Sequence, residues 1–202
     1  MKKLLYIGLL AGLYSCGPHM YSYKFSMKES KETKKLYYEN DTMSISFNFY
    51  PKGIKMDFVN KSDSVIRINW NEMKMTENDI AKKVVPVKRD KGKLKVVQSP
   101  SLISPKAKVS GLLVYEYNVC YSKKPEREIT AIKDMYPAQS NNSERKFVER
   151  LVGTRITLHL PVDIHNTSHK RTFNFLLEEI KSNRAVGAGD FLLLPLYVLA
   201  GL

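Results

Sequence analysis

Three histidines in the second half of the chain, His159, His165 and His169, are the residues best suited to metal chemistry. His165 and His169 have a spacing that would align two metal ligands on a helix, and Asp163 could supply a third. The intervening Asn166-Thr167-Ser168 is polar and favours the loop of a hairpin instead. Because a zinc site needs three or four converging ligands, we expect polar loop histidines, no metal site and no cofactor.

The common catalytic motifs are missing from the sequence, which contains no HExxH, GxSxG, P-loop or GxGxxG pattern. Glu178 and Glu179 are adjacent, and adjacent residues of a strand face opposite sides of a sheet. They would therefore make a poor acid–base pair. The sequence indicates a protein that is not an enzyme, with a hydrolase of unrecognised site as an alternative.

Positive charge is concentrated in the middle of the chain, whose formal net charge is +13. Candidate contacts for an anionic ligand are Lys88, Arg89, Lys91, Lys93 and Lys95. The last three alternate with other residue types, which predicts three charges on one strand face. Such a face could contact lipid head groups, lipopolysaccharide or acidic glycans. Alternatively, its lysines only keep an edge strand from associating. Nucleic acid is not an expected partner, because stacking aromatics are not interleaved with the basic residues.

Two short segments, Asp41-Thr42-Met43 and Asp63-Ser64-Val65, resemble the O-glycosylation sequon of Bacteroidota-type bacteria. That sequon is an Asp, a hydroxyl residue and then an apolar residue. The resemblance implies Thr42 and Ser64 as candidate attachment sites, both in expected loops or strand edges.

The N-terminus has the pattern of an export signal: Lys2 and Lys3 precede an apolar run, Leu4 to Leu13, that is too short to span a bilayer. Leu13-Tyr14-Ser15-Cys16 then resembles the lipobox of bacterial lipoproteins. That resemblance implies a signal peptide over residues 1–15 and acyl chains such as palmitate on Cys16. Gly17 is compatible with outer-membrane delivery. Cys120, the other thiol, lies in a strand-like run and is expected to be buried.

The C-terminal segment over residues 183–202 is strongly apolar, with Phe191 to Leu199 at its centre. As a helix, residues 185–202 would fall just short of a hydrocarbon core about 30 Å thick. A strand buried on both faces would show the same pattern. A buried terminal segment and a membrane-associated one are both open interpretations.

The elements that must position these residues are mostly strands, because apolar residues alternate with polar ones in short segments between turn residues. Residues 16–33 are polar and are interpreted as a tether, and a β-sandwich domain is expected over 34–182. The expected strands cover residues 43–50, 54–59, 66–70, 84–89, 94–98, 155–164 and 172–180, among others. Residues 165–170 are expected to be a loop, and Pro161 to fit an edge or bulge. One short helix is expected over 143–151, capped by Ser143. About eight strands predict an all-β, antiparallel sandwich.

A family resemblance agrees with this fold. Phe58-Val59-Asn60-Lys61-Ser62, then Ile66 to Trp70-Asn71 and Ser101 to Pro105, look like the core of small bacterial lipoproteins with an immunoglobulin-like sandwich. The similarity covers roughly residues 40 to 120. It implies a lipid-anchored envelope protein that acts as a non-catalytic binding or structural module. Its partners would be the membrane, through Cys16, and an envelope protein or an anionic glycan or lipid. An accessory subunit of an envelope assembly is the alternative.

Overall fold

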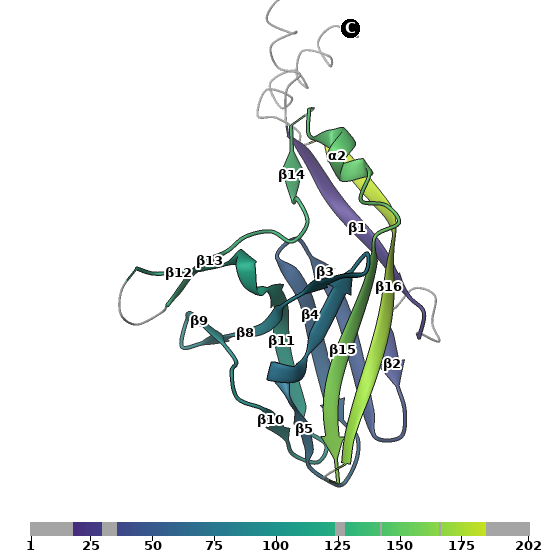
Figure 1. The fold of residues 1–202 in the computed structure, drawn as a ribbon, viewed down its shortest axis with the longest axis vertical. Helices are drawn as coiled ribbons and strands as arrows, with labels where there is room; N and C mark the ends of the chain where they lie inside the picture. The colour runs from purple at the N-terminus through teal and green to yellow at the C-terminus, as the bar shows by residue number, and fades with distance from the viewer. Residues whose placement is uncertain (1–17, 30–35, 124–127, 142, 166, 185–202) are drawn as a thin grey trace, which may run out of the picture. The chain divides into compact units, whose positions relative to one another are not determined.

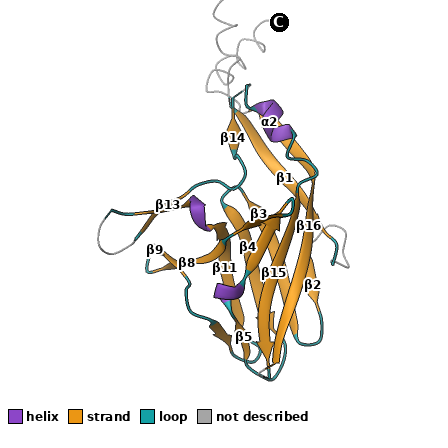
Figure 2. Ribbon diagram, viewed as in Figure 1, coloured by secondary structure: helices purple, strands orange, loops and turns teal. Residues whose placement is uncertain are grey.

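The structure is a computed structural model that describes residues 18–29, 36–123, 128–141, 143–165 and 167–184. The chain divides into two compact units. The larger unit comprises Tyr23–Pro137 and Leu151–Ile180, and the smaller one Met1–Ser22, Ala138–Arg150 and Lys181–Leu202. Strands dominate the described residues, with one short α-helix and two 3-10 turns (Figure 2).

The strands form two large sheets, in which every recorded pairing is antiparallel (Figure 1). The first sheet has the order β10-β5-β15-β16-β1-β14, with β6 also pairing with β15 and β7 with β6. Its strands are β10 (Ser101–Ile103), β5 (Ile66–Ile68), β15 (Arg155–Ile164), β16 (Thr167–Arg184), β1 (His19–Met27), β14 (Gln139–Ser140), β6 (Lys74–Glu77) and β7 (Ile80–Lys82). The second sheet has the order β2-β3-β4-β11-β8-β9. Its strands are β2 (Tyr37–Glu39), β3 (Met43–Tyr50), β4 (Gly53–Asn60), β11 (Lys108–Tyr115), β8 (Val84–Asp90) and β9 (Lys93–Val96).

The core of the larger unit lies between these two sheets. On β3, Ile45 and Phe47 face inward while the residues between them face outward, as a period of two requires. Aromatic contacts join the sheets directly: the Phe47 ring centroid lies 5.0 Å from that of Phe173 and 5.1 Å from that of Phe175, both on β16. The expected all-β, antiparallel sandwich is confirmed.

A third, small layer covers part of the second sheet. It is a two-stranded ribbon of β12 (Val119–Tyr121) and β13 (Ile129–Ile132), which follows the 3-10 turn Glu116–Asn118. Val119 and Ile132 of the ribbon pack with Val87 and Val114 in an apolar cluster separate from the main core. The ribbon therefore covers the outer face of β8 and β11.

Several expectations about individual segments were wrong. Residues 16–33 are not a tether throughout, because His19–Met27 forms β1, with Tyr21, Phe25 and Met27 buried. The sandwich thus starts before residue 34, and β16 carries it past residue 182 to Arg184. The described residues contain sixteen strands rather than about eight, because many, such as the two-residue β14, are too short to show a period.

The loop expected over 165–170 is also shorter than predicted. Ile164 pairs with Thr167, so only a tight turn separates β15 from β16, and His169 lies in β16 opposite Val162. Pro161 lies in an internal strand, not at a sheet edge. It sits between the residues that pair with β5 and those that pair with β6, where a missing N–H breaks no ladder bond.

The expected helix and buried thiol are corrected in detail. Helix α2 spans Arg145–Glu149 only, and Ser143 does not cap it, because the N-cap residue is Glu144, without a side-chain capping hydrogen bond. The Asn141 Oδ1 atom accepts a hydrogen bond from the Glu144 backbone N–H at 3.0 Å. Cys120 is a free thiol that is half-buried, because β12 belongs to the ribbon and not to the main core.

Candidate functional site

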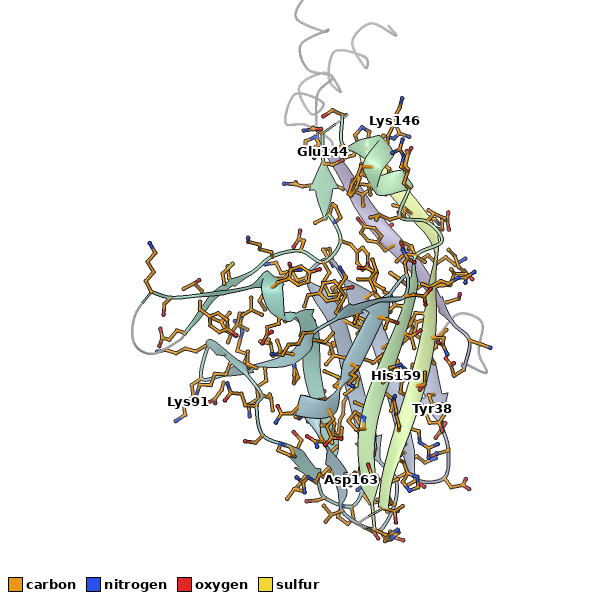
Figure 3. The ribbon with its side chains drawn as sticks, viewed as in Figure 1. Tyr38, Lys91, Glu144, Lys146, His159 and Asp163 are labelled. Atoms are coloured by element: carbon orange, nitrogen blue, oxygen red, sulfur yellow. The ribbon has the colours of Figure 1, made fainter. Side chains whose placement is uncertain are left out.

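The β8–β9 hairpin carries the basic residues singled out by the sequence. Asp90 pairs with Lys93 across a two-residue loop, Lys91-Gly92. Both loop residues have positive φ, 47° and 82°, as a type I′ turn requires. These two residues form the hairpin tip, and Figure 3 shows Lys91 at its end.

The pairing of β8 with β9 decides which basic side chains of the hairpin are neighbours. Lys88 and Lys95 are directly opposite each other on the two strands, where like charges repel. Asp90 relieves this repulsion, because its carboxylate lies 2.8 Å from the Lys95 Nζ atom. That hydrogen bond from Lys95 lowers the pKa of Asp90. Arg89 lies opposite Leu94, whose side chain packs against the ribbon cluster.

The sequence expectation about one shared face holds for two of the three lysines. Lys93 and Lys95 stand on the same face of β9, two residues apart. Lys91, however, is in the turn and not on the strand. The positive φ of Lys91 takes its side chain out of the strand's alternation, which spacing alone does not reveal.

A groove of about 490 Å³ lies between β9 and the β12–β13 ribbon, and we call it the hairpin groove. Lys93 bridges its two sides, because its Nζ atom lies 2.6 Å from the Glu128 Oε1 atom. The hydrogen bond from Lys93 lowers the pKa of Glu128, so this carboxylate is ionised at neutral pH. The lining residues are Lys93, Leu94, Lys95, Val96, Gln98, Tyr121, Glu128 and Ile129.

The hairpin groove combines the groups that hold a hydroxylated, negatively charged ligand. Lysines pair with anionic groups, Gln98 can donate and accept hydrogen bonds, and Tyr121, 40% exposed, offers a ring face. Sequence reasoning missed Gln98, Tyr121 and Glu128. Tyr121 and Glu128 come from the segment that forms the ribbon, about thirty residues further along the chain.

The candidate glycosylation residues lie at a different part of the larger unit, in two loops that are joined by hydrogen bonds. The Thr42 carbonyl accepts from the Lys61 backbone N–H at 2.8 Å, at the start of the loop that carries Ser64. Thr42 and Ser64 are both half-buried. The Ser64 Oγ atom is 2.6 Å from the His165 Nε2 atom, so its hydroxyl is engaged in a hydrogen bond.

The pair formed by Ser64 and His165 resembles the nucleophile and base of a hydrolase in distance. It lacks the other parts of such a site, since the hydrogen bond is exposed to solvent. In the described part of the chain, His165 Nδ1 has no hydrogen-bonded carboxylate to orient the ring. Asp163, two residues away, is instead 4.0 Å from the Arg67 Nε atom.

The other histidines do not gather around a metal. Within the described ranges, no three His, Cys, Asp or Glu side chains are arranged to hold a metal ion. His159 Nδ1 lies 3.0 Å from the Thr172 hydroxyl. Burial, with additional repulsion from Lys170 and Lys74, lowers the pKa of His159. In Figure 3, His159 and Asp163 lie along β15.

A buried cluster around Tyr115 and Tyr136 is the other concentration of titratable groups, and sequence reasoning missed it. The Tyr136 hydroxyl donates to the Glu77 carboxylate at 3.1 Å. Burial raises the pKa of Tyr115 and of Tyr136, and nearby Glu77 adds to both shifts. The Lys82 Nζ atom lies 6.0 Å from the Tyr115 ring centroid. Phenols with raised pKa values stay protonated at neutral pH, so these two tyrosines are poor general bases.

The remaining predicted features lie outside the described residues: the signal peptide over 1–15, Cys16 and the apolar run after Arg184. Among the helices that the structure does describe, none has the length and apolar character needed to traverse a bilayer.

Comparisons with known proteins identify no family. No protein-family model matches the sequence, and no curated protein does either. Among solved structures, the chain is similar to a protein from Archaeoglobus fulgidus, over 81% of this chain and 95% of that one. The identity is 10% and the TM-score 0.27, so the likeness carries no argument about function.

Proposed function

We propose that the chain is a lipid-anchored, non-catalytic binding module of the bacterial cell envelope, and that the hairpin groove binds an acidic glycan. The lipobox-like segment ending at Cys16 supports export and anchoring, and Gly17 is compatible with the outer membrane. The observation that carries the binding proposal is the groove itself. It places two lysines, an amide and a tyrosine ring along one concave surface.

The charge balance around the groove supports an anionic ligand. Lys93 and Lys95 each have an acidic partner. Lys88, Arg89 and Lys91 are exposed, and within the described residues none of them forms an ion pair. The hairpin therefore keeps a surplus of positive charge beside the groove. This surplus is better suited to a ligand with repeated carboxylates than to a neutral one.

Polygalacturonate, with neutral dextran as the uncharged comparison, is the probe that tests this proposal. We expect the wild-type protein to bind the acidic polymer and not dextran, with affinity falling as salt rises. Lys88→Glu/Lys91→Glu should weaken binding about 30-fold, since each lysine near an anionic surface contributes about 1 kcal/mol. Glu128→Gln should strengthen binding, because it removes a negative charge from the groove.

The matched control is Lys52→Glu/Lys170→Glu, which makes the same change in net charge at two exposed lysines away from the hairpin. It should change the affinity less than about threefold, because exposed charges beyond a Debye length of about 8 Å are largely screened. Equal losses in both double variants would show that binding follows net charge alone, and the groove proposal would fail. Binding of dextran as tight as that of polygalacturonate would also overturn it.

Location is tested separately, by protease accessibility of the tagged protein on intact cells with Cys16→Ser as the control. Digestion on intact cells supports a domain on the cell surface. Protection until the outer membrane is permeabilised supports a periplasmic one. Loss of Cys16→Ser from the membrane fraction together with lipid on wild-type Cys16 supports the anchor, and an unlipidated wild-type chain refutes it.

A further inference from the structure

The first and last strands of the described chain meet in the smaller unit. Strand β1 begins at His19 and is the neighbour of β16, which ends at Arg184. The His19 Nδ1 atom lies 3.0 Å from the Ser182 Oγ atom, although 163 positions separate them in sequence. The chain therefore enters and leaves the described fold at the same place.

Apolar groups are expected beyond both of these points. The proposed acyl chains on Cys16 come before His19, and Phe191 to Leu199 comes after Arg184. Three residues of extended chain reach at most roughly 10 Å, so a lipid on Cys16 would hold His19 within about the thickness of a head-group layer. The smaller unit, which contains His19, is consequently held close to an anchored bilayer.

Helix α2 belongs to the smaller unit and carries an exposed aromatic ring among cations. Val148 is 1% exposed, whereas Phe147 is 63% exposed. Arg145 is paired with Glu149 at 2.7 Å. Lys146 and Arg150 are exposed, and neither forms an ion pair among the described residues. Figure 3 shows Lys146 on α2.

An outward Phe between unpaired cations is poorly suited to water and well suited to a membrane interface. Insertion of the ring into the boundary between head groups and acyl chains is favourable because it removes apolar surface from water. The cations are in turn attracted by anionic lipid phosphates. We propose that Lys146, Phe147 and Arg150 form a membrane-contact surface, which seats the smaller unit on an anionic bilayer. The inference rests on the proposed lipid anchor for its orientation, while the contact itself depends only on α2.

Tryptophan placed on this surface reports the contact directly. Phe147→Trp is compared with Leu102→Trp, which labels an equally apolar site that is 72% exposed on β10 of the larger unit. The native Trp70 is 5% exposed and gives a constant background. The lipidated protein is reconstituted in vesicles of phosphatidylcholine and phosphatidylglycerol, with or without brominated acyl chains. After subtraction of the Trp70 background, we expect brominated lipid to reduce the emission of the Phe147→Trp protein at least twofold and to leave that of the Leu102→Trp protein unchanged.

Charge dependence completes the test. Adding Lys146→Glu/Arg150→Glu to Phe147→Trp should abolish the quenching, and so should vesicles of phosphatidylcholine alone when Cys16→Ser protein is used. Equal quenching of both tryptophans, or none at Phe147→Trp, overturns the inference. Mass spectrometry of wild-type Cys16 decides the anchor independently: an unlipidated chain refutes the anchor, while quenching of Cys16→Ser protein by anionic vesicles still upholds the contact.

Discussion

Asn60 provides the sharpest stability prediction, because its fully buried amide joins three segments of the larger unit. The Nδ2 atom lies 2.7 Å from the Ser64 carbonyl oxygen, 3.0 Å from that of Ile103 and 3.1 Å from that of Ser104. The Oδ1 atom accepts from the Ser62 backbone N–H at 2.9 Å and from its hydroxyl at 2.7 Å. An amide is the side chain that can donate and accept at once in this position.

The magnitudes follow from these contacts. The three Nδ2 contacts share two hydrogens and Oδ1 accepts two bonds, so Asn60→Ala removes the equivalent of four hydrogen bonds at about 1 kcal/mol each. Water can replace some of them at the half-buried Ser62. We therefore expect a loss of about 3 kcal/mol. Asn60→Asp keeps the shape but turns an oxygen toward the carbonyl groups, which raises the pKa of the new carboxyl above its unfolded value of about 3.9. At pH 7 we expect a loss of about 4 kcal/mol.

The pH dependence distinguishes this explanation from a simple packing defect. A carboxyl whose pKa is raised by folding is most stable below its unfolded pKa and loses stability as pH rises through the folded one. The loss in Asn60→Asp should therefore shrink to about 1 to 2 kcal/mol at pH 4. Asn48→Asp, at an exposed position of β3, should stay within about 0.5 kcal/mol of the wild type.

Urea unfolding followed by the fluorescence of the single tryptophan, Trp70, measures these differences. With a slope of about 2 to 3 kcal/mol per molar urea, Asn60→Ala should lower the midpoint by about 1 M or more. If Asn60→Asp matched the wild type at pH 7, or lost the same stability at pH 4 as at pH 7, the hydrogen-bond assignment would be refuted.

Two further predictions concern a glycine and a histidine. Gly53→Ala should destabilise the fold by about 1 to 3 kcal/mol in the same assay, because its Cβ would collide with the Leu113 carbonyl oxygen. Gly111→Ala, which has open space around it, is the control, and equal losses would contradict the clash. Lys74→Ala should raise the pKa of His159, measured by NMR, because a repelling charge is removed while the larger effect of burial stays. Since a lowered His pKa costs stability as pH falls below about 6.5, Lys74→Ala should lose less folding stability than the wild type on acidification. An unchanged pKa of His159 would contradict this explanation.

The sequence allowed the sandwich to be predicted where strands were long and alternated cleanly, as in β3 and β4. It misplaced Lys91 on a strand face, because the positive φ that puts this residue in the β8–β9 turn is not visible in the spacing. Strand β1 shows the opposite case. Tyr21, Phe25 and Met27 do alternate with polar residues, but the charged residues that follow, Lys28 to Glu32, suggested a solvated tether.

The candidate site was less predictable, because its parts come from distant segments. Lys93 and Lys95 could be named from their spacing, whereas Glu128 meets Lys93 only because the ribbon folds back over β8 and β11. Such a pairing is decided by tertiary packing, and no local pattern encodes it. The polar network around Asn60 has the same origin, since Ile103 ends β10 and Ser104 follows it, about forty residues further along the chain.

The place of β1 has a consequence for how the chain acquires its fold. This strand lies between β16 and β14, so the first strand of the sandwich can pair only after segments from the far end of the sequence are available. Pairings between such distant segments make folding slow, because a large loop must close before any contact compensates for it. A chain emerging N-terminus first therefore cannot complete its first sheet until β16 has emerged. For an exported protein, this delay would keep the polypeptide extended during passage and make closure of the sheet the last event on the far side.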